Sequence, residues 1–263
     1  MLALGMRTIF FLILLMFSPL WSQENGHATA ELWLAAPRME EGKPTVIPAA
    51  IRMVYEKGWH GYWVNPGEGG MKTEVTWKLP AGLAAAALQF PAPKREMTGE
   101  LACYGYAGEV LLPVLFTVSG ALPQEVEIQA TVSWLACDEK GCSSGEATVK
   151  AKLADASRSA AIAAAFAGLP VVDEKLKLQV SEADGWVTLE LTGADHLDLQ
   201  GAEIFPVTEQ ALDPRAPILW AKTKTSYQAR VKKNEYANGA ISQLSLVIVP
   251  KPPQRALQVE WKK

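Results

Sequence analysis

Cys137 and Cys142 are the residues with the clearest chemistry in this sequence, and four residues separate them. Two thiols this close can form a disulfide and open it again, which is the chemistry of thiol–disulfide exchange. A disulfide across so short a loop removes little freedom from the unfolded chain and therefore adds little stability. The spacing favours a redox-active pair, and a static disulfide that pins a hairpin stays open as the alternative.

The flanking residues predict an antiparallel hairpin that holds the two cysteines opposite each other. Apolar residues alternate before the pair, at 126, 128, 130, 132 and 134, and after it, at 147, 149, 151 and 153. Pairing Cys137 with Cys142 sets apolar against apolar along this run, and a one-residue slip would destroy the match. Directly opposed Cβ atoms lie about 4.5–5.5 Å apart, so a disulfide closes with little adjustment. We expect both sulfurs on the outer face of the hairpin, away from the core.

The charges beside the pair act in opposite directions on its reactivity. Asp138 and Glu139 adjoin Cys137 and should raise the pKa of its thiol, because a nearby negative charge disfavours the thiolate. Lys140 would lower that pKa, as would His60 if it lies close. The sequence does not determine whether these charges together raise or lower the pKa of the Cys137 thiol.

Two further residues are candidates for the site. Cys103 is the odd cysteine of three, and it is either a buried small hydrophobe or a third thiol near the pair. His60 lies between Trp59 and Tyr62 and is either a structural histidine or one that tunes the pKa of the cysteines. These residues together with the cysteine pair could instead gather ligands for copper or zinc, which is an alternative function of a different class.

The first residues predict export. Arg7 precedes an apolar run over residues 8–20 that is too short for a bilayer span, as in a signal peptide. We expect cleavage between residues 22 and 30, where Ala28-Thr29-Ala30 is an A-x-A match, and an uncleaved anchor is the alternative. The mature protein is then periplasmic or otherwise exported and soluble, without stable membrane insertion, in a compartment where disulfides persist.

Composition limits the remaining possibilities. The chain has 263 residues and a net charge of −3, which allows one or two domains and gives no electrostatic case for binding nucleic acid or an anionic membrane.

The pattern along the chain predicts a mainly β protein in two parts. Short strands separated by Gly and Pro clusters fill residues 31–153 and favour a β-sandwich. Residues 154–169 are Ala-rich and predict a helical linker that Asp155 or Ser157 caps at its start. Residues 170–263 return to a β pattern, with a hairpin turn at Asp184-Gly185. This second smaller β domain shows no catalytic constellation, and we expect a structural or partner-facing role for it.

Three motifs, taken in order, resemble a known family. They are Gly-Trp-His-Gly-Tyr-Trp-Val-Asn-Pro-Gly at 58–67, Tyr-Gly-Tyr-Ala-Gly-Glu-Val-Leu-Leu-Pro at 104–113 and Trp-Leu-Ala-Cys at 134–137. This pattern is similar to the N-terminal periplasmic domain of the thiol:disulfide interchange protein DsbD, in the branch found in the copper-sensitivity suppressor protein ScsB. The resemblance implies an immunoglobulin-like sandwich that carries one redox-active cysteine pair and needs no organic cofactor.

The resemblance also implies roles for residues and partners. A cap over residues 101–108 would cover the cysteines, with Tyr104 and Tyr106 as shields, and the strand with His60 and Tyr62 would flank the pair. Cys103 would then lie inside the cap. Such domains pass electrons between a membrane-embedded donor and thioredoxin-like proteins, as protein-disulfide reductases do.

This chain stops at Lys263 without membrane helices, so we expect a separate membrane donor of the DsbD or ScsB type. A redox-inactive binding module with a structural disulfide remains the other reading, and the direction of electron flow is left open.

Overall fold

The computed structural model of the protein describes residues 26–39, 41–42, 44–120, 126–153 and 156–263. Residues 1–25 of the expected signal peptide, which was placed over residues 1–30, and the expected helix cap Asp155 lie outside these residues. In the described part of the chain, no helix has the length and apolar character needed to cross a membrane.

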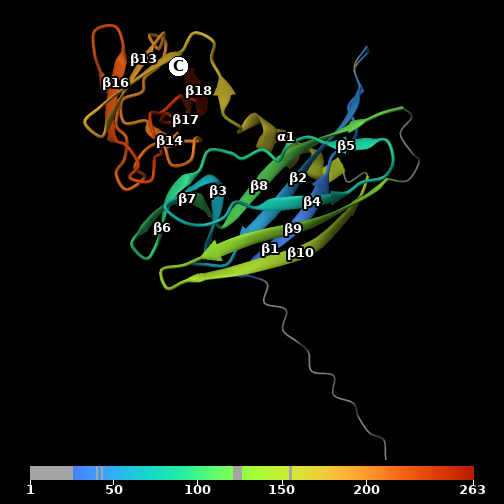
Figure 1. The fold of residues 1–263 in the computed structure, drawn as a ribbon. Coiled ribbons are helices and arrows are strands. Elements are labelled where there is room, and N and C mark those ends of the chain that lie inside the picture. Colours follow the sequence, from blue (N-terminus) through green and yellow to red (C-terminus); the bar gives the residue numbers. More distant parts are fainter. Residues whose placement is uncertain (1–25, 40, 43, 121–125, 154–155) are drawn as a thin grey trace, which may run out of the picture.

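Residues 28–152 form two sheets that pack face to face, which we call the first β unit (Figure 1). One sheet has the order β1-β2-β8-β5, with β1 Ala28–Leu34, β2 Thr45–Tyr55, β8 Glu109–Val118 and β5 Leu83–Ala85. The other has the order β10-β9-β3-β7-β6, with β10 Cys142–Lys152, β9 Glu127–Cys137, β3 His60–Gly67, β7 Leu101–Ala107 and β6 Lys94–Thr98. A further strand, β4 Glu74–Lys78, pairs with β9.

The core of the first unit comes from the inward residues of alternating strands. Ile51, Leu112, Val132 and Trp63 are almost completely buried between the sheets. Burial of such side chains is the main stabilising contribution to a sandwich of this kind. The alternation seen in the sequence is thus the alternation of one buried and one outer face.

The predicted cysteine hairpin is confirmed in its register. Cys142 pairs with Cys137, Ala147 with Val132 and Ala151 with Ile128. The apolar face of the hairpin points into the core, and a register shifted by one residue would turn these apolar side chains to the outer face.

A single α-helix, α1 Ala156–Ala167, follows the sandwich among the described residues. Its Ile162 is fully buried against Ala35 and Ala50 on the outer face of the first sheet, with Phe166 packed beside them. The chain leaves the helix at Gly168, whose N–H donates to the carbonyl of Ala164. The helix therefore covers one face of the sandwich as well as connecting the two parts.

Residues 171–262 form a second pair of sheets, which we call the second β unit (Figure 1). One sheet has the order β11-β18-β17-β14, with β11 Val171–Val172, β18 Leu257–Lys262, β17 Gln243–Val249 and β14 Glu203–Pro206. The other has the order β12-β13-β16-β15, with β12 Lys177–Ala183, β13 Trp186–Thr192, β16 Tyr227–Lys232 and β15 Ala221–Lys222. The expected fold class, a mainly β protein with a sandwich, a short helix and a second β unit, is confirmed.

The two β units share part of one core. Phe205 of β14 and Val247 of β17 are buried in the core of the first unit. The Phe205 ring makes edge contacts with Trp63 and Tyr104, at centroid distances of 6.3 and 5.4 Å. The side-chain amide of Asn65 donates a buried hydrogen bond of 2.7 Å to the Pro206 carbonyl. The packing fixes the second unit against the end of the sandwich that carries β3 and β7.

Candidate redox site

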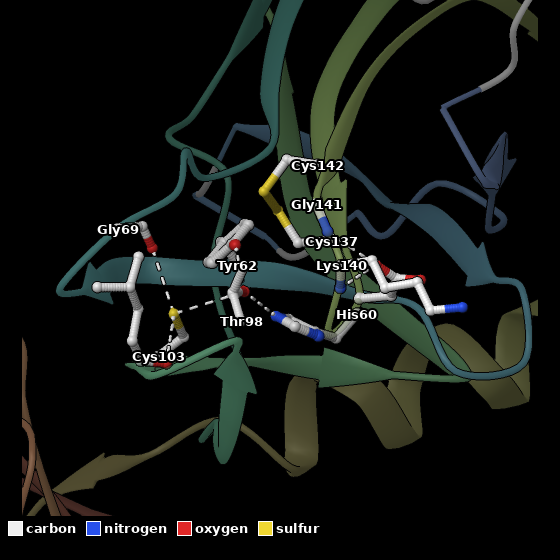
Figure 2. The surroundings of a disulfide bond; sticks show 11 residues. His60, Tyr62, Gly69, Thr98, Cys103, Cys137, Lys140, Gly141 and Cys142 are labelled. Carbon is white, nitrogen blue, oxygen red and sulfur yellow. Dashed lines mark hydrogen bonds between the residues drawn. A yellow bond between two sulfur atoms is a disulfide. The ribbon is translucent and has the colours of Figure 1, made fainter.

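Cys137 and Cys142 form a disulfide at the end of the β9–β10 hairpin, with their Cα atoms 4.1 Å apart (Figure 2). The four residues between them make a tight turn, in which the Asp138 N–H donates to the Gly141 carbonyl at 3.0 Å. The Asp138 carboxylate accepts the N–H groups of Lys140 and Gly141, at 2.7 and 3.0 Å. The turn therefore fixes both cysteines through local hydrogen bonds.

The two cysteines differ in exposure. Cys142 is exposed, whereas Cys137 is 0% exposed. Both were expected on an open outer face, and the structure corrects this for Cys137. Its side chain lies on the outer face of the sheet, as the register requires, but a small apolar cluster with Tyr62, Cys103 and Leu135 covers it there. Only one half of the disulfide is open to an incoming thiol.

His60 and Tyr62 lie beside Cys137 because β3 meets β9 at this point. His60 is the register partner of Cys137, and Tyr62 follows two residues later on the same face of β3. Both side chains are buried. Gly70 lies against the ring of Tyr62, where an added Cβ would come within 2.2 Å of a ring carbon. The glycine-rich stretch after β3 thus allows the chain to pass close to Tyr62.

Thr98 is a site residue that sequence reasoning missed. Its hydroxyl lies 3.1 Å from His60 Nε2 and 3.1 Å from the Tyr62 hydroxyl (Figure 2). Thr98 ends β6, and Gly99 begins the two-residue turn into β7, since Thr98 pairs with Leu101. Gly99, at the first position of a two-residue turn, was the available sequence signal for this hairpin.

The β6–β7 hairpin, residues 94–107, covers the buried half of the disulfide. Thr98 reaches the two side chains beside Cys137, and the turn lies against the cysteine loop. A Cβ added at Gly99 would lie 3.8 Å from the Glu139 carbonyl oxygen. We call this segment the cover hairpin.

Cys103 belongs to the same cluster as Cys137 and is 1% exposed. Its Sγ lies 3.5 Å from the Gly69 carbonyl, 3.6 Å from the Leu101 carbonyl and 3.8 Å from the Thr98 hydroxyl. Burial raises the pKa of the Cys103 thiol. Cys103 is therefore a protonated, hydrogen-bonded thiol on the inner face of the cover hairpin.

Tyr104 and Tyr106 do not shield the cysteines. Both belong to the core of the first unit, where Tyr104 contacts Trp63 and the Tyr106 hydroxyl donates to the Pro91 carbonyl at 2.7 Å. The expected cap over residues 101–108 is the strand β7 and its end, and alternate residues of a strand point to opposite faces. Cys103 faces the disulfide, so Tyr104 must face the core.

The interior of the site carries little charge. Burial lowers the pKa of His60, while the charge of Asp138 acts in the other direction. Burial raises the pKa of Tyr62 to about 12. The N–H groups of Lys140 and Gly141 lower the pKa of Asp138, so a fixed negative charge remains at the surface beside Cys137.

The residues named as candidate metal ligands have other contacts in this structure. Within the described residues, no three His, Cys, Asp or Glu side chains are gathered so that they could hold a metal ion. Cys137 and Cys142 are bonded to each other, and the Nε2 atom of His60 is directed to Thr98.

The fold and the site together define an immunoglobulin-like sandwich with a disulfide at one hairpin end and a second hairpin lying over it. Residues 36–154 match the family described as "Thiol:disulfide interchange protein DsbD, N-terminal".

The structure is also similar to a solved structure over most of the chain. It resembles the N-terminal periplasmic domain of ScsB from Proteus mirabilis, with a TM-score of 0.67 and 18% sequence identity over 90% of this chain and 93% of that one. At this identity the likeness establishes a common fold, and its extent includes the second β unit. A comparison with curated proteins gave no match.

Proposed function

We propose that this protein carries electrons outside the cytoplasm by thiol–disulfide exchange through a reversible Cys137–Cys142 disulfide. The observation that carries the proposal is the unequal exposure of a disulfide between neighbouring residues of one hairpin. Such a bond joins no distant segments, and it presents Cys142 to solvent while Cys137 stays buried. The match of residues 36–154 to the DsbD N-terminal family supports the same chemistry.

The exchange proceeds in two balanced steps. A thiolate of the donor attacks the exposed sulfur of Cys142, which forms a mixed disulfide and releases the Cys137 sulfur as a thiolate that takes up a proton. A second donor thiolate then attacks the donor sulfur of the mixed disulfide and releases Cys142. The donor leaves as a disulfide, and two electrons and two protons now reside on Cys137 and Cys142. The same steps in reverse reduce an acceptor, with Cys142 as the attacking residue.

The residues around the reduced cysteine pair favour protonated thiols, which slows their reaction with other disulfides. Burial of Cys137 and the nearby carboxylate of Asp138 both favour the protonated thiol. His60 stays neutral near neutral pH because its burial lowers its pKa, so it supplies no positive charge that would stabilise a thiolate. His60 and Tyr62 act as site-shaping residues, and Thr98 holds their polar groups in place. A protonated pair retains its electrons until a suitable partner docks.

The proposed partners are thioredoxin-like extracytoplasmic proteins on one side and a separate membrane donor of the DsbD or ScsB type on the other. This role requires export of the protein, which the proposed signal peptide would provide. Gly26 accepts a hydrogen bond of 3.0 Å from the Trp134 indole, and Ala28 is 1% exposed within β1. Cleavage before Gly26 would preserve these contacts, whereas cleavage after the A-x-A match would remove them.

The test is a redox titration of the protein with Cys103 replaced by alanine, so that the pair contributes the only thiols. The fraction reduced is read by thiol trapping and mass spectrometry in buffers of defined potential. Reversible two-electron reduction while the fold persists is the expected result. A pair that is reduced only when the protein unfolds would make the disulfide structural and remove the proposal.

Two matched variants test the order of the steps. In the same background, Cys137→Ser leaves the exposed Cys142, and Cys142→Ser leaves the buried Cys137. Each is mixed with a thioredoxin whose resolving cysteine has been removed and whose remaining cysteine is activated as a mixed disulfide. The Cys137→Ser variant should form the covalent complex rapidly and the Cys142→Ser variant slowly. The opposite ranking would contradict the assignment of Cys142 as the attacking residue.

A further inference from the structure

The second β unit contacts the cover hairpin directly, through Arg95 of β6. The Arg95 guanidinium donates to the Pro214 carbonyl at 2.8 Å and to the Ala216 carbonyl at 3.4 Å. It also lies over the rings of Tyr104 and Phe205, at 5.5 and 5.7 Å from their centroids. One side chain of the hairpin thus binds the backbone of the second unit and packs on an aromatic residue from each unit.

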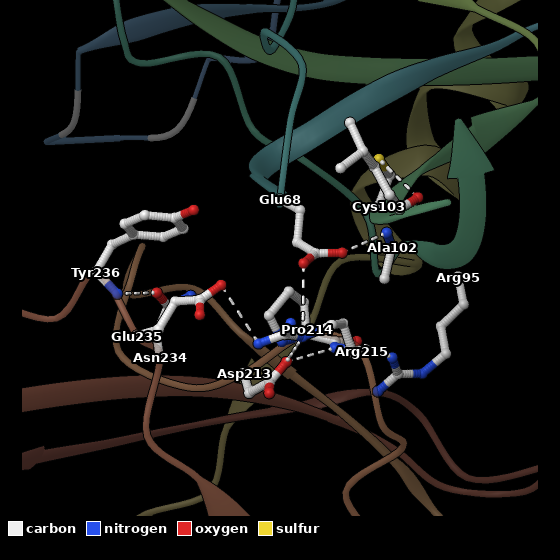
Figure 3. A network of polar contacts seen from close by, with 11 residues as sticks. Glu68, Arg95, Ala102, Cys103, Asp213, Pro214, Arg215, Asn234, Glu235 and Tyr236 are labelled. Atoms are coloured by element: carbon white, nitrogen blue, oxygen red, sulfur yellow. Dashed lines mark hydrogen bonds and ion pairs between the residues drawn. The ribbon is translucent and has the colours of Figure 1, made fainter. Parts of the chain in front are cut away.

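The loop that receives Arg95 has a fixed shape. Asp213 is buried, and its Oδ1 accepts both the N–H and the Nε–H of Arg215 at 2.9 Å (Figure 3). This arrangement closes the turn that contains Pro214 and Ala216. The two carbonyls are therefore presented to Arg95 by a turn that Asp213 organises.

A second connection reaches the other strand of the hairpin. Glu68 accepts the N–H of Ala102, on β7, at 2.7 Å, and its other oxygen lies 3.6 Å from Arg215 Nε (Figure 3). Both strands of the cover hairpin are thus tied to residues 213–216, one directly and one through Glu68.

The hairpin needs such a support because of its position in the sheet. β6 is an edge strand that pairs only with β7 in the sheet order. At its far end Thr98 lies against His60 and Tyr62, over the buried Cys137. The strand β7 also pairs with β3 and is held in place there, so the part of the hairpin that can lift is β6 with its turn. The second unit holds this part at one end and Thr98 holds it at the other.

We infer that the second β unit holds the cover hairpin closed over the disulfide, and that Arg95 is the positioning residue through which it does so. The inference deepens the proposed function and rests on it for its consequence, since a hairpin held closed limits how a protein partner reaches the pair. The second unit then regulates access to a site to which it contributes no reacting atom.

The oxidised protein contains a reporter for this motion. With Cys137 and Cys142 joined, Cys103 is the remaining thiol of the three cysteines. It lies on the inner face of the hairpin's own strand β7, against Tyr62 and Cys137, and is hydrogen-bonded to Thr98 and Leu101. Its alkylation by N-ethylmaleimide requires the hairpin to open, so the alkylation rate measures opening without any exchange partner.

The experiment compares this rate in three variants of the oxidised protein. Arg95→Ala should raise it about tenfold or more, because hydrogen bonds from a charged donor are lost. Arg95→Lys, which keeps the charge, should fall between Arg95→Ala and the parent. Arg52→Ala is the matched control, since Arg52 pairs with Glu31 and Glu109 on the opposite sheet. The control should raise the rate only as far as its loss of global stability predicts.

A double-variant cycle links the effect to the second unit. Asp213→Ala loosens the receiving turn and should accelerate alkylation in the same way as Arg95→Ala. If both act on one contact, the double variant should react little faster than either single variant. Rates that multiply, or an Arg95→Ala rate no higher than that of the control after correction for stability, would overturn the inference.

Failure of the proposed function would be seen separately. Reduction of the disulfide by dithiothreitol and by reduced thioredoxin is measured in the same variants. A disulfide that neither reagent reduces in the folded protein removes the exchange function, while the alkylation result still decides whether the second unit holds the hairpin. With exchange intact, Arg95→Ala should accelerate the reaction with thioredoxin more than that with dithiothreitol, and equal acceleration would contradict regulation of partner access.

Discussion

His60 lies directly opposite Cys137 on the neighbouring strand, and both side chains are buried on the outer face of the sheet. A buried imidazole beside a disulfide sulfur connects the protonation of His60 to the stability of the fold. Because Thr98 holds the ring of His60 from the cover hairpin, the same contact connects the hairpin to the disulfide.

Stability should fall at mildly acidic pH because of His60. Burial lowers the pKa of His60 below its usual 6.5 in the folded protein, so between the two values the unfolded chain binds more protons and stability rises with pH. His60 therefore destabilises the fold as pH falls from 7 through 6.5 towards its folded pKa. The free energy of unfolding, measured by urea titration at several pH values, should fall more steeply for the parent than for His60→Gln. Parallel curves would show that His60 titrates normally.

Loss of the Thr98 hydroxyl should loosen the site. Thr98→Val keeps the shape of the side chain but leaves His60 and Tyr62 without this partner, which costs about 1–3 kcal/mol when such groups are buried. The expected results are a lower free energy of unfolding and faster alkylation of Cys103. Thr148→Val, at an exposed position of β10, is the matched control and should change neither.

Reduction of the disulfide should leave the fold intact. The β9–β10 hairpin is held by eleven residue pairs, and the chain-entropy relation for so short a loop gives about 2 kcal/mol. The reduced protein should keep its far-ultraviolet circular dichroism and unfold at a somewhat lower denaturant concentration. Cys142→Ala should likewise fold and lose exchange. Unfolding on reduction alone would support a structural bridge.

The two β units should unfold together. Phe205 of the second unit is 0% exposed in the core of the first, so Phe205→Ala should destabilise the protein by about 3–5 kcal/mol. Thermal unfolding followed by tryptophan fluorescence and by circular dichroism should give coincident transitions in the parent. Leu219→Ala, at a residue 65% exposed in the same unit, should have little effect. Two separate transitions in the parent would show that the shared core does not couple the units.

The sequence by itself determined the hairpin and its register. Alternation of apolar residues on both sides of Cys137 and Cys142 admits one pairing that buries a continuous face, so the opposition of the two cysteines follows from local pattern alone. The sandwich, the Ala-rich helix and the second β unit follow from the same kind of local periodicity. The resemblance to the DsbD N-terminal family rested on three short motifs, and it is confirmed over residues 36–154.

Only the tertiary structure decided what covers the disulfide. The local sequence pattern defines the two faces of β7 but does not say which face meets Cys137. The motif at 104–113 suggested Tyr104 as the residue that covers the disulfide, whereas Cys103 and Thr98 are the residues that lie on the face towards Cys137. Burial of Cys137 depends on β3 and on the cover hairpin, which are far from it in sequence. The contacts of Arg95 and Phe205 with the other unit are of the same kind, because packing between distant segments is set by their complementary shapes and leaves no periodic signal in either segment alone.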